Sequence, residues 1–194
     1  MKVFENSAIK VGLEKNCFWA TAPSNIALIK YMGKSCDKEN VADNVSLSFT
    51  LKDKLAKVEL YVSDSWSWCS LDEPGMRLSL DSFEQTKYIE FAKKVSQQLG
   101  LKNCFLIKSG CNFPVSCGIA SSAASFAALT SCLVNAASFL IKGFKINFDS
   151  IVDISKHGSG SSVRSFLNEW VMWDLGIQNI DNNFKDWRHK VVTV

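Results

Sequence analysis

Proline, glycine and histidine are all scarce in this sequence, with 3, 10 and 2 copies among 194 residues. Together with 47% hydrophobic residues, this composition excludes a disordered chain and a collagen-like repeat. Long runs of like charge are absent too, and 22 basic against 19 acidic residues give a net charge of only +3. We therefore expect no nucleic-acid partner.

Cysteine spacing typical of metal sites or disulfide frameworks is also missing. The seven cysteines are odd in number, no Cys-x-x-Cys pair occurs, and only two histidines accompany them. Reduced thiols in a cytoplasmic protein fit this pattern better than a disulfide framework or a zinc site. The first residues lack the apolar stretch of a signal peptide, which supports the same localisation.

One uncharged stretch, residues 109–141, is long enough to cross a membrane. It is interrupted by Pro114, two glycines, two asparagines and many serines. The continuous apolar part is therefore short, and we expect a buried helix of a soluble domain and no membrane partner.

Strands and helices are both predicted, which favours an α+β domain. Residues 17–32 are expected to be extended, and alternation of polar and apolar residues predicts separate strands at 46–51 and 57–62. Shorter apolar runs predict further strands at 105–107, 169–173 and 189–194.

Three helices are predicted. The first covers residues 82–99, with Asp81 as its cap, Gly100 after its end and Phe83, Tyr88, Phe91, Val95 and Leu99 on its apolar face. A buried helix begins near Ser121 after a loop at 110–118, and a short helix covers 148–156. Residues 158–162 are expected to form a flexible polar turn.

The strongest chemical signal is the segment PVSCGIASSAAS at residues 114–125. Small residues let a ligand approach the backbone, and the following helix presents free N–H groups to an anion. Ser121 and Ser122 add hydroxyls suited to a phosphate or to a magnesium-bound phosphate. A tightly packed helix capped by serine, with no ligand, explains the same residues.

Two further segments carry cations. Lys30 and Lys34 flank Tyr31 and Gly33 and are suited to a phosphorylated substrate, although surface lysines that end a strand are the simpler explanation. In HGSGSSVRS, at 157–165, Arg164 follows serines and glycines and suits a carboxylate or a phosphate. A glycine–serine hinge with a solvated arginine is the alternative.

The order of these motifs resembles that of the diphosphomevalonate decarboxylase family of the GHMP kinase superfamily. The series runs from the Asn25–Lys34 segment through Asn-Val-Ser-Leu-Ser at 44–48 and Pro-x-x-x-Gly-x-x-Ser-Ser-Ala at 114–123 to Gly-Ser-Gly-Ser-x-x-Arg at 158–164. The resemblance implies a GHMP-kinase N-terminal domain, ribosomal protein S5 domain 2-like, at residues 1–185. Residues 186–194 are expected to be the first strand of a C-terminal domain.

The resemblance also implies an activity: ATP-dependent decarboxylation of mevalonate 5-diphosphate to isopentenyl diphosphate, with phosphorylation of the C3 hydroxyl. Its catalytic residues would be Lys30 near the reacting hydroxyl, Arg164 on the carboxylate, and Ser122, which would also serve Mg²⁺ through a phosphate. The nucleotide would contact Pro114, Gly118, Ala120, Ser121, Ser122 and Ala123. The substrate would contact Asn25, Tyr31, Met32, Gly33, Lys34, Ser159, Gly160, Ser161, Ser162, Val163 and Arg164. A homodimer is a possible assembly.

Some positions depart from the family pattern. Met32 replaces a tryptophan, Gln85 stands in the place of a substrate-binding arginine, and His157 and Asn168-Glu169 replace an arginine and two glycines. The family's Phe-Asp-x-Gly-Pro-Asn segment, which carries its catalytic aspartate, does not occur here, so we expect no turnover by this chain alone. A mevalonate or phosphomevalonate 3-kinase and an inactive phosphate-binding module are the alternative functions.

Overall fold

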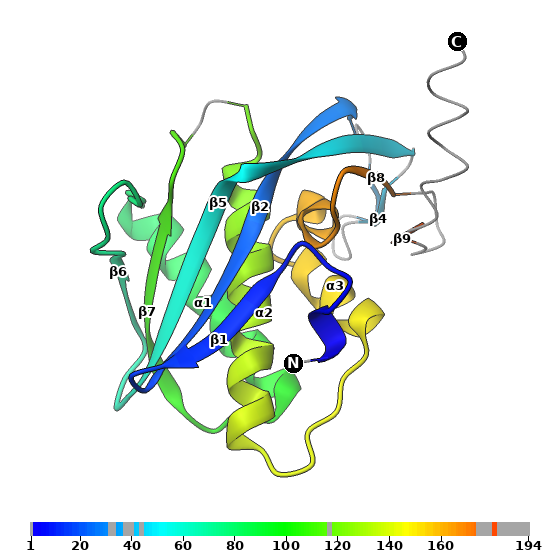
Figure 1. Ribbon diagram of the computed structural model, residues 1–194. Coiled ribbons are helices and arrows are strands. Elements are labelled where there is room, and N and C mark those ends of the chain that lie inside the picture. Colours follow the sequence, from blue (N-terminus) through cyan, green and yellow to red (C-terminus); the bar gives the residue numbers. More distant parts are fainter. Residues whose placement is uncertain are drawn as a thin grey trace.

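A mostly antiparallel sheet forms the centre of the computed structural model (Figure 1). The strand order is β1 (Lys10–Glu14), β2 (Cys17–Ile29), β5 (Ser46–Ser63), β7 (Cys104–Cys111) and β6 (Ser67–Ser70), and β6 runs parallel to β7. At one end, β8 (Trp170–Trp173) pairs with the start of β5, and β9 (Ile180–Asp181) pairs with β8. A separate pair is formed by β3 (Lys34–Cys36) and β4 (Val41–Ala42).

The structure describes residues 2–30, 34–36, 41–42, 45–115, 118–173 and 180–181, and for 34–36, 41–42 and 180–181 it describes the backbone only. The strand predicted at 189–194 lies outside these ranges. The one predicted at 169–173 is confirmed as β8, which begins one residue later because Glu169 has a left-handed backbone (φ 60°).

The two strands predicted at 46–51 and 57–62 are wrong as separate elements, because β5 is one continuous strand of 18 residues. The charged residues between the two predicted strands, Lys52, Asp53 and Lys54, are exposed. They lie where the pairing of β5 with β2 shifts register, opposite the junction of Pro23 and Ser24. Such an irregularity bends a strand without ending it. Similarly, the short strand predicted at 105–107 extends to the eight residues of β7.

Helices α1 (Ser82–Leu99), α2 (Ser121–Leu140) and α3 (Phe148–Lys156) lie on one side of the sheet (Figure 1). All three confirm their predictions. In α1, the Asp81 side chain accepts from the Glu84 N–H, the Glu84 side chain accepts from the Asp81 N–H, and Gly100 is left-handed (φ 79°). Only Phe83 was placed on the wrong face, since it is 76% exposed.

Helix α2 is the core of the domain. It contacts β2, β5, α1 and α3. By length and composition it could cross a membrane, but 83% of its 18-residue apolar stretch is buried inside the protein. Its buried side chains, which include Leu129 and Leu133, belong to the same hydrophobic core as those of the sheet, which include Val58, Leu60, Phe105 and Ile107.

The flexible polar turn predicted at 158–162 is wrong. After Ser159 the chain forms a 3₁₀ helix, η2 (Gly160–Phe166), that contacts α2 and α3. Phe166 anchors it: the ring is fully buried and lies 6.0 Å from that of Phe148. A second 3₁₀ helix, η1 (Lys2–Phe4), lies at the N-terminus. The α+β class is confirmed.

Candidate functional site

Two cavities lie beside the N-terminal end of α2. The smaller, of about 270 Å³, is bounded by α1, α2 and residues 78–80. The larger, of about 700 Å³, is bounded by the end of β2, residues 157–161 and Arg164. Lys87 of α1 lines both, so its side chain borders the two spaces.

The N-terminus of α2 has no side-chain cap, unlike those of α1 and α3. Asp81 caps α1 and Asn147 caps α3, whereas the residue before α2 is Ala120, a left-handed alanine (φ 52°). A serine-capped helix, the ligand-free explanation of this segment, is therefore wrong. Ser121 and Ser122 instead occupy the first turn, where N–H groups without helical partners attract anions.

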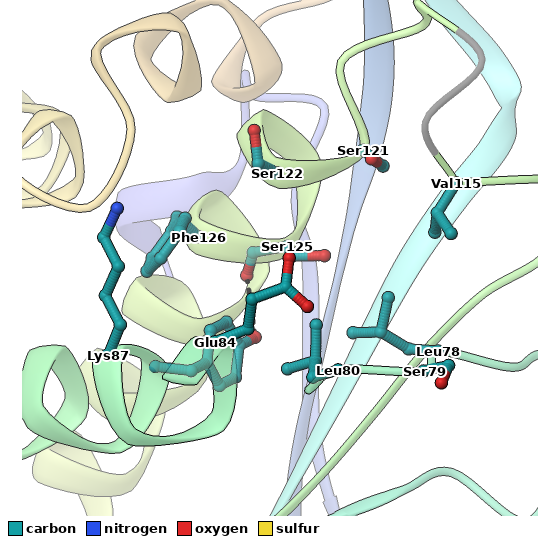
Figure 2. Close-up of a pocket in the computed structure, with 11 residues that line it drawn as sticks. Leu78, Ser79, Leu80, Glu84, Lys87, Val115, Ser121, Ser122, Ser125 and Phe126 are labelled. Carbon is teal, nitrogen blue, oxygen red and sulfur yellow. Dashed lines mark hydrogen bonds between the residues drawn. The ribbon is translucent and has the colours of Figure 1, made fainter. Parts of the chain in front are cut away.

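The smaller cavity is lined by both polar and apolar side chains (Figure 2). Ser121 and Ser122 lie at the start of α2, and Lys87 extends from α1 on one side of the view. Leu78, Leu80 and Val115 lie on the other side. The shape suits a ligand with an anionic group and an apolar or aromatic part.

Tyr88 and Glu84 are fixed within the wall of this smaller cavity. The Tyr88 hydroxyl donates to the Ser125 carbonyl oxygen at 3.2 Å, and burial raises the pKa of Tyr88 above its usual value, which keeps the phenol protonated. The Glu84 carboxylate is held by the α1 capping box.

The larger cavity is lined by cations. Lys30 directly follows β2, Lys87 comes from α1, and Arg164 comes from η2, with His157 beside them. Among the described residues that line it, none is an aspartate or a glutamate. The chemistry is therefore that of a site for an anion.

A buried hydrogen-bond frame fixes Arg164, which is 4% exposed and so is not the solvated arginine of the alternative. Its Nε donates to Asn25 Oδ1 at 3.4 Å and its Nη1 donates to Ser46 Oγ at 3.3 Å. Asn25 Nδ2 in turn donates to Ser165 Oγ at 2.9 Å. Both the oxygen and the nitrogen of the Asn25 amide therefore form hydrogen bonds within the protein, and in this structure Asn25 orients Arg164.

The predicted site residues separate into three sets. Those that line the cavities are Asn25, Lys30, Gly118, Ala120, Ser121, Ser122, Ser159, Gly160, Ser161 and Arg164. Those that line neither are Pro114, Ala123, Ser162 and Val163; the Ser162 hydroxyl, for example, is fully buried and accepts from Ser155 at 2.7 Å. Tyr31, Met32 and Gly33 lie outside the described residues, and Lys34 is described only as backbone of β3.

For two residues of α1, the structure adds to or differs from what the sequence indicated. Lys87 was missed, because one lysine on an amphipathic helix carries no motif. Gln85, expected in the place of a substrate-binding arginine, uses its Nε2 to donate to the Leu80 carbonyl oxygen at 2.9 Å. It lines neither cavity.

Comparison with known proteins gives consistent matches. The family described as diphosphomevalonate decarboxylase-like N-terminal domain matches residues 22–183. The diphosphomevalonate decarboxylase of Debaryomyces hansenii is 33% identical over 178 residues, which cover 81% of this chain and 42% of the relative.

Solved structures agree with these sequence matches. A mevalonate diphosphate decarboxylase from Legionella pneumophila is 40% identical with a TM-score of 0.72, over 82% of this chain and 51% of that one. A structure described as MDDEF in complex with MVAPP, AMPPCP and magnesium is 25% identical with a TM-score of 0.67, over 81% of this chain and 46% of that one. The chain thus spans about half the length of these relatives, or somewhat less.

Proposed function

Since this chain belongs to the family of diphosphomevalonate decarboxylase-like N-terminal domains, we propose that it supplies the ATP and substrate sites of a diphosphomevalonate decarboxylase. The observation that carries the proposal is that two cavities share Lys87 in their lining, one beside the uncapped N-terminus of α2 and one around the buried Arg164. Phosphoryl transfer requires two anionic ligands held end to end, and this arrangement provides for both.

The smaller cavity is proposed to take ATP. Its phosphates would contact the first-turn N–H groups of α2, the hydroxyls of Ser121 and Ser122, and the Lys87 ammonium, while the base would lie against Leu78 and Leu80. The described residues contain no cluster of three His, Cys, Asp or Glu side chains. This fits a magnesium ion held mainly by phosphate oxygens with help from Ser122, and such an ion would offset the charge of the phosphates.

The larger cavity is proposed to take mevalonate 5-diphosphate. Lys30 and Lys87 would attract its diphosphate and the transferred phosphate, and Arg164 would hold its carboxylate through a bidentate contact. The buried frame of Asn25 and Ser46 supports this role, because a guanidinium with fixed orientation loses little freedom when a carboxylate binds.

In the proposed reaction the γ-phosphoryl group of ATP passes to the C3 oxygen, whose proton is released. The C–C bond to the carboxylate then breaks, and its electron pair forms the new double bond as phosphate leaves with the C3–O pair. The products are ADP, phosphate, carbon dioxide and isopentenyl diphosphate. The chain contributes positioning and positive charge, which are the main requirements of such transfers.

Binding of mevalonate 5-diphosphate, measured by calorimetry, tests the proposal. We expect saturable binding, weakened by Arg164→Gln and unchanged by Lys142→Gln, a control lysine after α2. Absence of binding to the folded wild-type chain would contradict the substrate assignment. When ATP and Mg²⁺ are added, phosphorylation without carbon dioxide would favour a 3-kinase, and binding of both ligands without any reaction fits a chain that lacks a catalytic carboxylate.

A further inference from the structure

A third space, of about 420 Å³, lies between α1 and α3. Its apolar lining consists of Phe91 and Val95 of α1, Phe126 of α2 and Ile154 of α3, and we call it the helix groove. Phe91, Val95 and Phe126 are buried, and the ring centroids of Phe91 and Phe126 are 4.9 Å apart in an edge-to-face arrangement. Ile154 is half-buried. The groove therefore has a packed apolar inner wall.

Positive charge lies along the edge of the helix groove. Lys87 and Lys94 are exposed and lie about two turns apart on α1, on the same helix face as Phe91. Among the described residues, neither of these lysines forms an ion pair. Glu90 is the one acidic side chain among the described residues that line the groove, and it pairs with Lys93 at 2.7 Å. An apolar wall edged by positive charge suits an anion that carries a hydrocarbon chain.

The helix groove borders the larger cavity. Lys87, His157 and Gly158 line both spaces. Gly158 lies directly against the groove wall, because a Cβ at this position would be 2.3 Å from Cδ1 of Phe126. The larger cavity has the chemistry of an anion site, so an anion bound there beside Lys87 would have the groove next to it.

We propose that the helix groove binds the hydrocarbon chain of an organic phosphate whose phosphate group lies in the larger cavity, beside Lys87. The phosphate would meet the lysine ammonium groups, and the chain would cover Phe91, Phe126 and Ile154. Mevalonate 5-diphosphate bears a hydroxyl and a carboxylate where this ligand bears plain hydrocarbon, so it would not use the groove, and the two molecules would compete for the larger cavity. The competition rests on the proposed function, whereas binding of the chain rests on the groove and its charges.

Calorimetry with butyl, hexyl and octyl phosphate tests the proposal. We expect the affinity of the wild type to rise at least about twofold for each added methylene group, since full burial of a methylene gives about fourfold and a groove buries only part of the chain. Ile154→Ser should abolish most of this rise. The matched control is Ile89→Ser, which changes another half-buried isoleucine of the same core that lines neither the groove nor the two cavities, and it should keep the rise. Lys87→Gln should weaken all three phosphates by a similar factor, because it removes charge beside the phosphate group.

Equal affinity for the three phosphates would overturn the proposal, and so would a rise that Ile154→Ser retains or that both isoleucine variants lose alike. Circular dichroism checks that the variants are folded, and Ile154→Thr, which keeps the branched Cβ, replaces the serine variant if that one is not. Titration of the same proteins with mevalonate 5-diphosphate separates this proposal from the proposed function. If the phosphates bind according to chain length and mevalonate 5-diphosphate does not bind, only the proposed function fails. If mevalonate 5-diphosphate binds and chain length has no effect, only the helix groove fails as a site.

Discussion

Replacing Asn25 tests how Arg164 is held. The residue is fully buried, accepts from Arg164 Nε and donates to Ser165 Oγ. Asn25→Ala removes both hydrogen bonds and leaves a buried guanidinium with one partner fewer. A neutral hydrogen bond contributes about 0.5–1.5 kcal/mol and one to a charged group about 1.5–3 kcal/mol, so we expect the free energy of unfolding to fall by about 2–4.5 kcal/mol.

Asn25→Asp separates the effect of Asn25 on the orientation of Arg164 from the effect of the positive charge of Arg164. The introduced carboxylate still accepts from Arg164 and accepts from the Ser165 hydroxyl, so both contacts survive and stability should change by about 1 kcal/mol or less. It also offsets the positive charge of Arg164. A substrate carboxylate should then bind at least about tenfold more weakly, which corresponds to about 1.4 kcal/mol.

Urea unfolding and calorimetry with mevalonate 5-diphosphate measure the two effects. Asn147→Asp is the matched control, because it makes the same change at the cap of α3, where aspartate also caps well. Two results would exclude this role of Asn25: Asn25→Asp binding the substrate as tightly as the wild type, or Asn25→Ala losing less than about 0.5 kcal/mol of unfolding free energy, the lower limit for a single hydrogen bond.

Three further outcomes are expected. Ser122→Ala should weaken binding of ATP with Mg²⁺ by about 1–3 kcal/mol, measured by calorimetry, because a hydrogen bond to a charged phosphate is lost. Gly158→Ala should lower the midpoint of urea unfolding by an amount equal to about 1–3 kcal/mol, since the new Cβ would lie 2.7 Å from Cγ of Phe126. Burial raises the pKa of the Cys111 and Cys132 thiols above the ordinary 9.0, so these thiols lose their protons more readily in the unfolded chain. The free energy of unfolding should therefore fall as pH rises above 9.0. An unfolding free energy that stays constant between about pH 8 and about 10.5 would contradict this.

Much of the fold could be predicted because its signals are local. The bounds of α1 follow from Asp81, Glu84 and Gly100, which act within a few residues of each helix end. The continuity of β5 could not be predicted in this way. Charged residues at its centre look like a turn, and the strand continues across them because Leu51 and Leu55 on either side both pair with β2.

The site residues that belong to sequence motifs could be predicted, whereas those that reach the site through tertiary contacts could not. The serines at the start of α2 follow from the sequence pattern. The contact between Asn25 and Arg164 joins residues 139 positions apart, and no spacing rule predicts it. Lys87 reaches both cavities only because α1 packs beside α2.

Calorimetric titration of this chain with ATP and Mg²⁺ is the most direct test of the central claim, which is that a nucleotide binds between α1 and the start of α2. We expect saturable binding at one site, weakened by both Ser122→Ala and Lys87→Gln and unchanged by Lys142→Gln. Folded protein that does not bind the nucleotide, or that binds it equally well in all these variants, would exclude a nucleotide site at this position.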